Sequence, residues 1–176
     1  MKTLFAVFSL FLLVSADVYA GQTVEGIVKA VYDGDTVLLA TREGSRLKVR
    51  LYGIDAPETK KPDMPGQPFG EAAKRTLVNK IMGRRVTADI VDIDQYRRPV
   101  VVIRCSGVDI NGEMVAEGFA WAYRRYLQGP YASEYIAAEN RARSRGSGLW
   151  HDANPRPPWE FRQSFKGPGN RHERLR

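Results

Sequence analysis

The sequence predicts an α+β fold, a small five-stranded β-barrel with about three helices. Five short segments are rich in β-branched residues, and three others carry apolar residues at helical spacing. The length of 176 residues suits one domain with a substantial core and is short for two. Short strands interleaved with helices suggest a strongly bent barrel whose open end is plugged by a helix.

The first three strands are expected to form a continuous meander. Residues 23–41 hold two β-branched runs, and Asp-Gly-Asp at 33–35 separates them as a hairpin signal. Apolar and polar residues then alternate over 47–52, which predicts a half-buried strand. Gly53 and Pro57 end this strand.

The later elements follow a Pro- and Gly-rich loop at 62–70. Leu77, Val78 and Ile81 lie at helical spacing before Gly83, which predicts a helix over 71–82. The other expected elements are strands at 86–91 and 100–104 around a polar turn at 92–98, a short helix at 113–118 and a last helix at 130–146. We therefore expect a Greek-key barrel of the OB type.

The N-terminus resembles a targeting segment. Lys2 precedes an apolar run over 4–14, and Val18 to Ala20 present residues suited to a signal peptidase. We expect residues 1–20 to be a signal peptide and the protein to be exported, either periplasmic or secreted. The alternative, a membrane anchor, is disfavoured because the run is shorter than the ~20 apolar residues that a span needs. No stable membrane span is then expected after cleavage.

The mature chain is expected to divide into two parts. Residues 21–152 would form the folded domain, which we expect to be a monomer. Residues 153–176 are rich in Pro, Gly and Arg and show no period, so we expect a flexible basic tail.

Composition excludes several kinds of catalytic centre. The chain has one cysteine and two histidines, and His151 and His172 both lie near its end. A zinc cluster, a Ser-His-Asp triad or a His-based nuclease centre cannot be assembled from them within the folded part. The net charge of +7 indicates a polyanionic partner, either nucleic acid or an anionic membrane surface.

Three acidic residues are expected to meet at one rim of the barrel. Asp35 follows the hairpin turn, Asp55 follows the third strand, and Glu58 is held near it by the rigid Pro57. Such crowding requires compensation by a cation or by guanidinium groups. Oxygen ligands suit Ca²⁺ or Mg²⁺, and the scarcity of His and Cys disfavours zinc. We expect calcium.

Two arginines are candidates for the same rim. Arg50 lies on the polar face of the third strand, and Arg98 lies in the turn before the fifth. A divalent ion and two guanidiniums would stabilise the charge that a phosphodiester gains when water attacks it, while a carboxylate activates the water. Each feature alone also has a structural explanation, since Asp-Gly-Asp is usually only a turn and exposed arginines are usually solvated.

An ordered series of motifs resembles the staphylococcal nuclease (thermonuclease) family. The motifs are Asp-Gly-Asp-Thr at 33–36, Arg-Leu-Tyr-Gly-Ile-Asp-Ala-Pro-Glu-Thr at 50–59, Asp-Gln-Tyr-Arg-Arg at 94–98, the region 108–120 and Gly-Leu-Trp at 148–150. Together they cover roughly residues 24–150. The resemblance implies an OB-fold endonuclease that hydrolyses the phosphodiester bonds of DNA and RNA with calcium.

The resemblance also implies roles for individual residues. The implied calcium ligands are Asp35, Asp55 and the backbone carbonyl of Ala56. The implied catalytic residues are Arg50 and Arg98, which would bind the phosphate, and Glu58, which would act as general base or as an acid that positions the water. Tyr123 and Tyr126 resemble the tyrosines of the family's nucleotide pocket, although packing at the domain rim would explain them equally well.

Two departures from the family pattern concern the site. Ala56 stands where the best-known member has threonine, but any residue supplies a carbonyl ligand. Arg97 replaces the glycine before the catalytic arginine, which leaves the geometry of that turn open. Alignment on Tyr96 selects Arg98 as the catalytic arginine, with Arg97 as the alternative.

Two other functions remain open. One is an OB-fold module that binds nucleic acid without catalysis, although the presence of all the expected side chains argues against it. The other is a basic protein that binds anionic envelope material and uses its acids only structurally.

Overall fold

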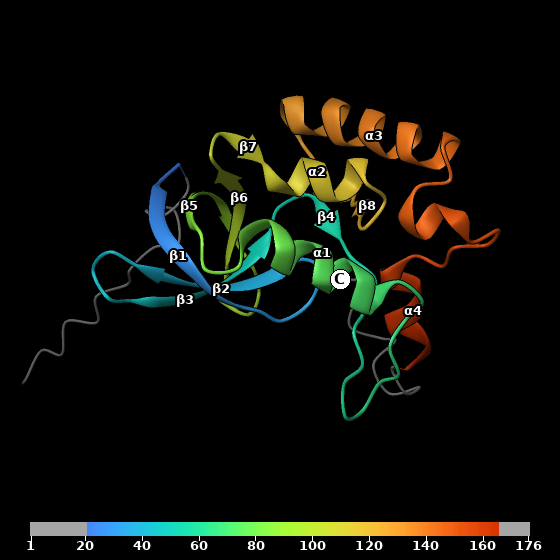
Figure 1. Cartoon of the computed structure of the whole chain (residues 1–176), viewed down its shortest axis with the longest axis horizontal. Helices are drawn as coiled ribbons and strands as arrows, with labels where there is room; N and C mark the ends of the chain where they lie inside the picture. Colours follow the sequence, from blue (N-terminus) through green and yellow to red (C-terminus); the bar gives the residue numbers. More distant parts are fainter. Residues whose placement is uncertain (1–20, 166–176) are drawn as a thin grey trace, which may run out of the picture.

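Five strands close into a barrel in the computed structural model, which describes residues 21–165 (Figure 1). The predicted signal peptide, residues 1–20, lies outside this range. The barrel strands are β1 (Thr23–Val31), β2 (Thr36–Thr41), β3 (Arg46–Leu51), β5 (Arg85–Ile93) and β6 (Pro99–Cys105). They follow the order β3-β2-β1-β5-β6, and a parallel pairing of β3 with β6 closes the ring. The predicted five-stranded OB-fold barrel is confirmed.

Alternation along β3 separates the core from the functional rim. Val49 and Leu51 are each 1% exposed and lie within the hydrophobic core. Arg50, between them, points the other way and is partly exposed. A strand that packs one face on the core therefore presents the arginine on its other face.

The turn between β1 and β2 has the position that Asp-Gly-Asp predicted. A Cβ on Gly34 would lie 2.6 Å from the Cβ of Ala56 and 2.8 Å from that of Ala73. Only glycine therefore lets residues 32–35 pack this closely on the loop after β3 and on the helix that holds Ala73. This close approach brings Asp35 beside Ala56.

Three two-residue strands accompany the five-stranded ring, and two of them form a separate sheet. They are β4 (Ile54–Asp55), β7 (Val108–Asp109) and β8 (Trp121–Ala122). β4 pairs antiparallel with β8, with Asp55 opposite Trp121. This pairing places Asp55 next to the segment that continues into Tyr123.

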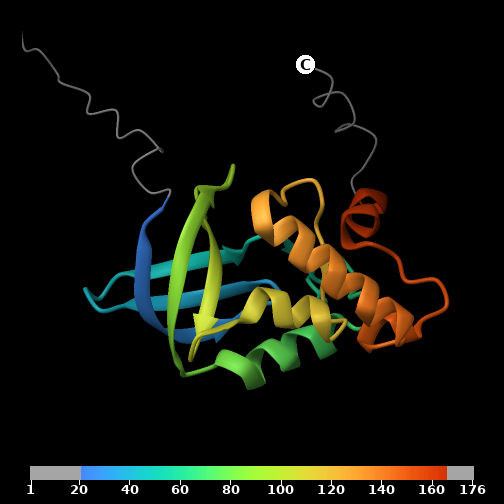
Figure 2. The ribbon, with the colours of Figure 1, turned by 90° about the horizontal axis from the view of Figure 1, so that it is seen from above.

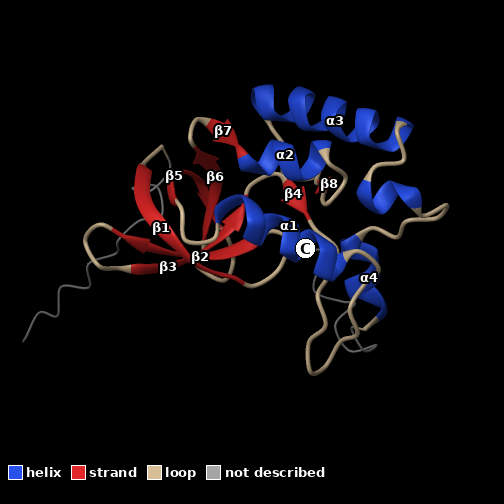
Figure 3. Cartoon of the chain, in the orientation of Figure 1, coloured by secondary structure: helices blue, strands red, loops and turns tan. Residues whose placement is uncertain are grey.

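Helices cover one end of the barrel, as Figures 2 and 3 show from two sides. They are α1 (Gly70–Ile81), α2 (Ile110–Ala116), α3 (Gly129–Ser144), the 3₁₀ helix η2 (Gly148–His151) and α4 (Pro158–Ser164). α2 begins earlier than the predicted residue 113 because the side chain of Asp109 caps it, accepting from the N–H of Gly112 at 3.0 Å. Within residues 21–165 no helix is long and apolar enough to cross a bilayer.

α4 lies in the segment for which the sequence predicted a flexible tail. Pro157 and Pro158 set the backbone at its start, and Pro158 is buried. The helix has seven residues, too few to show a hydrophobic period, and its contacts are with residues far away in the sequence. Residues 166–176 lie outside the described range.

Candidate active site

Arg50 joins the two aspartates that the sequence placed at the rim. One of its terminal nitrogens, Nη2, lies 3.2 Å from Asp35 Oδ2 and 2.9 Å from Asp55 Oδ1. Asp35 is 4% exposed and Asp55 is fully buried. The two carboxylates therefore share a single guanidinium nitrogen in a site shielded from water.

Asp35 is held by donors on several sides. Thr36 Oγ1 donates to Oδ1 at 2.9 Å, and the N–H of Ala56 donates to Oδ2 at 3.1 Å. Burial opposes ionisation of this carboxyl, but the charge of Arg50 and these hydrogen bonds outweigh it and lower the pKa of Asp35. Burial and the charge of the neighbouring Asp35 raise the pKa of Asp33 to about 7.

Glu58 lies at the same rim and is 7% exposed. Lys61 Nζ lies 2.6 Å from its Oε2. Its backbone is fixed by Gln67, whose side-chain Oε1 accepts from the Glu58 N–H at 3.0 Å and whose backbone N–H donates to the Glu58 carbonyl at 2.8 Å. The loop after Pro57 thus holds the carboxylate in one place.

Arg162 of α4 is a residue of this cluster that sequence reasoning missed. Its guanidinium donates to Asp55 Oδ1 at 3.0 Å, to Asp55 Oδ2 at 2.8 Å and to Glu58 Oε1 at 2.7 Å. Burial opposes its charge, but the bonds to Asp55 and Glu58 prevail and raise the pKa of Arg162. It stands 107 residues from Asp55 in a stretch without a period, so no local signal pointed to it.

Arg98 is not in contact with these acids. Its Nε and Nη2 both lie 2.7 Å from Asp94 Oδ2, and its guanidinium lies 5.4 Å from the ring centroid of Tyr96. Arg97 has φ of 60°, so it adopts the left-handed conformation for which glycine is favoured. Arg97 therefore occupies the glycine position of the turn, and Arg98 pairs with Asp94 of the same turn.

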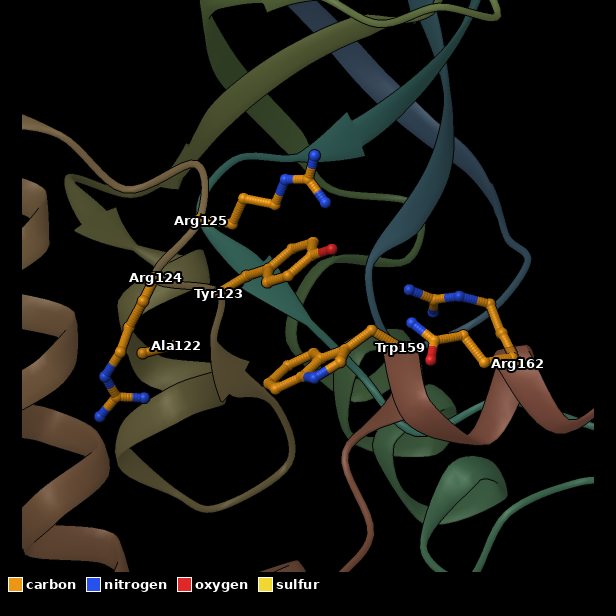
Figure 4. A pocket seen from close by; sticks show the side chains of 7 residues that line it. Ala122, Tyr123, Arg124, Arg125, Trp159 and Arg162 are labelled. Carbon is orange, nitrogen blue, oxygen red and sulfur yellow. The ribbon is translucent and has the colours of Figure 1, made fainter. Parts of the chain in front are cut away.

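Tyr123 lines a cavity of about 320 Å³, and Tyr126 packs against Tyr123. Their ring centroids are 5.0 Å apart in an edge-to-face arrangement. Figure 4 shows Tyr123 and Trp159 lying one above the other, with Arg162 extending from α4 into the same space. The cavity is lined by Ala122, Tyr123, Arg124, Arg125, Trp159, Arg162 and Gln163. Aromatic faces and guanidiniums in one cavity suit a base and a phosphate.

The donor atoms at the rim are of the kind that a hard divalent cation prefers. Asp35 and Asp55 supply carboxylate oxygens, and Ala56 adjoins them through its N–H bond to Asp35. Among the described residues no group of three or more His, Cys, Asp or Glu side chains is arranged to hold a metal. Backbone carbonyls and water would have to complete a coordination shell around the two aspartates.

Comparison with known proteins decides the family. Residues 48–152 match the sequence model described as "Staphylococcal nuclease homologue". The chain belongs to the staphylococcal nuclease family. This assignment confirms the predicted family and the predicted enzyme class, a phosphodiester hydrolase.

Members of the staphylococcal nuclease family in bacteria and plants are similar to this chain. An uncharacterized endonuclease of Haemophilus influenzae is 37% identical over 139 residues, which is 79% of this chain and 73% of that protein. A micrococcal nuclease of Shigella flexneri is 34% identical over 155 residues, covering 82% of this chain and 84% of its own. A probable staphylococcal-like nuclease of rice is 32% identical over 147 residues, 81% of this chain but only 42% of the rice protein.

Proposed function

We propose that the protein is an exported, calcium-dependent nuclease that acts as a monomer and hydrolyses phosphodiester bonds in DNA and RNA by water attack. The observation that carries this proposal is the cluster of Asp35 and Asp55 on Arg50, to which Arg162 joins Glu58 by pairing with both Asp55 and Glu58. Membership of the staphylococcal nuclease family and the nuclease relatives support it. Export rests on the pattern of residues 1–20 alone.

Asp35, Asp55 and the carbonyl of Ala56 would hold the calcium ion. When bound, the ion would polarise the phosphate oxygens and stabilise their developing charge. The structure supports this assignment because Asp35 and Asp55 lie against the same guanidinium nitrogen, which places their oxygens together, and both carboxylates are almost free of water. Calcium is favoured over zinc by a set of oxygen donors.

The protein side chains would carry out the remaining steps. Glu58 accepts a proton from the attacking water, whose oxygen forms the new bond to phosphorus as the ester oxygen leaves and takes up a proton. Arg50 donates to the phosphate oxygens, where negative charge grows. Arg98 would join it after exchanging its bond to Asp94 for one to the phosphate.

Tyr123 and Tyr126 would bind a nucleotide next to the scissile phosphate. Tyr126 is 52% exposed, and Tyr123 presents its ring to the cavity shown in Figure 4. Stacking on an aromatic face is tolerant of sequence because every base has one. This property fits a nuclease that accepts both DNA and RNA.

Plasmid cleavage tests the proposal. Glu58→Gln removes the base and retains the shape, so cleavage in calcium should fall about 100-fold or more. Glu134→Gln, an exposed change on α3, is the matched control and should leave cleavage unchanged. Addition of EDTA should abolish cleavage by the wild type.

Other outcomes would decide against the proposal. Cleavage that survives both EDTA and Glu58→Gln would refute the proposed mechanism. Binding of DNA at low salt without cleavage would instead indicate the silent OB-fold module.

A further inference from the structure

α4 engages the two carboxylates that the proposed reaction needs. The guanidinium of Arg162 donates to both oxygens of Asp55 and to Oε1 of Glu58. Lys61 forms an ion pair with Oε2, the other oxygen of Glu58. In this arrangement every oxygen of the two carboxylates accepts from a cation, so Glu58 is poorly placed to take a proton and Asp55 to bind calcium.

The three acids of the proposed site are matched by three cations of the chain itself. Asp35, Asp55 and Glu58 are matched by Arg50, Arg162 and Lys61, and each of these cations forms an ion pair with at least one of the acids. A divalent cation added to this set would meet the guanidinium of Arg162 at the same oxygens. Like charges in a buried site repel strongly. Calcium and Arg162 are therefore competitors for Asp55.

A second contact of α4 covers the aromatic part of the site. Trp159 stacks on Tyr123, with ring centroids 5.1 Å apart and ring planes 6° from parallel. It also meets Trp121 edge to face at 5.5 Å. Trp159 and Arg162 are three residues apart and thus share one face of the helix, as Figure 4 shows. One helix face thus presents an aromatic ring where a base would stack and a cation where the metal would bind.

α4 is a short helix in which Pro158 is also buried. It has seven residues, well below the ~12 at which an isolated helix becomes marginally stable. The segment that leads into it is tied by Gln67, whose Nε2 donates to the carbonyl of Arg156 at 3.1 Å. Release of Pro158, Trp159 and Arg162 would therefore free the helix while the barrel stays folded.

We infer that α4 is an intrachain occupant of the active site, an inhibitory segment that calcium and nucleic acid displace. Arg162 stands in for the metal ion, and Trp159 stands in for a base. This inference rests on the proposed calcium-dependent hydrolysis, because it names what calcium must displace. The enzyme is then least active when calcium is scarce, and the switch lies in its own C-terminal segment.

Calorimetric titration of the full chain with calcium tests the competition. Arg162→Ala should lower the calcium Kd about tenfold, because the ion no longer displaces a guanidinium. Arg145→Ala is the matched control because it removes the same charge, and among residues 21–165 the side chain of Arg145 donates to the Arg141 carbonyl and to none of the rim acids. A calcium Kd that is unchanged or higher in Arg162→Ala would overturn the inference.

Hydrogen–deuterium exchange of the wild-type chain tests displacement without any substitution. Saturating calcium should speed amide exchange in residues 158–164 at least about twofold, because the docked helix is released. Equal or slower exchange in this segment would overturn the inference. This measurement keeps the test decisive if Arg162→Ala does not fold.

Cleavage assays separate failure of the inference from failure of the proposed function. Arg162→Ala should cleave faster than the wild type at limiting calcium. A drop of more than tenfold at saturating calcium, with the calcium Kd unchanged, would make Arg162 a catalytic residue and overturn the inference while leaving the nuclease proposal intact. Cleavage that resists EDTA in both chains, with no calcium binding, would instead refute the proposed function.

Discussion

Glu139 and Asp55 are both fully buried carboxylates, yet their surroundings differ. Glu139, on α3, accepts from the N–H of Ala122 at 3.0 Å and from Arg124 at 2.6 Å. Arg143, one turn further along the same helix, lies 3.5 Å away. The partners of Glu139 thus come from its own helix and from the β8 segment on which that helix packs.

Asp55 shares its cations with other acids. Arg50 serves Asp35 as well, and Arg162 serves Glu58 as well. By contrast, the described contacts of Glu139 include no second acid, and its two arginines are 49% and 41% exposed. Burial of a carboxylate therefore does not by itself mark a site. The site is marked instead by several acids that share the same cations. One of these cations, Arg162, comes from the C-terminal helix α4.

The strongest way to break this comparison is to neutralise Asp55. Asp55→Asn should reduce cleavage about 10²- to 10³-fold, because the calcium ion that stabilises the transition state loses a proposed ligand. Cleavage rates and urea unfolding should be measured on the same preparation. If the variant retains more than a tenth of the wild-type rate, Asp55 is not part of the active site.

Calcium should stabilise only the chain whose acidic rim is intact. At 100 times its Kd, the ion should raise the free energy of unfolding of the wild type by about 2.7 kcal/mol, because it binds the folded state alone. Asp55→Asn should lose this gain, whereas Glu139→Gln should keep it. Thermal unfolding with calcium and with EDTA measures the difference, and an equal gain in all three chains would contradict it.

Glu139 should matter for stability and not for cleavage. Glu139→Gln should lower the free energy of unfolding by about 2 kcal/mol, since the buried bond to Ala122 survives but two ion pairs are lost. Urea unfolding gives this value, with the exposed Glu134→Gln as control. Cleavage per folded molecule should match the wild type, and a loss greater than tenfold would show that the two carboxylates do not differ in kind.

Asp94, paired with Arg98, is a third carboxylate to compare with Asp55 and Glu139. It is more exposed than both, so its replacement should change stability least. Burial opposes ionisation of Asp94, but hydrogen bonds from the Arg98 backbone and side chain lower its pKa. Its stabilisation is therefore present above pH ~4, the unfolded value, and is lost as the pH falls through the lower folded value. Asp94→Asn should lower the free energy of unfolding above pH ~4 by less than about 1 kcal/mol, so that it varies less between pH 2 and pH 5. An unchanged profile between pH 2 and pH 5 would contradict the assignment.

Much of the barrel was predictable because its signals are local. The alternation around Arg50 and the Asp-Gly-Asp turn each lie within a few residues, and both predicted their elements correctly. The start of α2 was missed because Asp109, outside the predicted helix, supplies its cap. The pairing of β4 with β8 was missed because two-residue strands carry no period.

The candidate site divides in the same way. Asp35, Arg50, Asp55 and Glu58 follow turns and strand ends that the chain encodes locally, so their meeting at one rim followed from the order of the strands. The pairing of Arg98 with Asp94 instead of the rim depends on the backbone of one turn, in which Arg97 adopts φ of 60°.

Amino-acid order alone was sufficient for the barrel, the family and the acids of the rim, because periodicity and turn chemistry act over short stretches of chain. The state of those acids was settled only by folding, which brings α4 across from the far end of the domain. Arg162 and Trp159 reach Asp55 and Tyr123 through contacts that span more than 30 positions in the chain. Such contacts leave no local pattern, and their strength comes from burial and from matched charge in three dimensions.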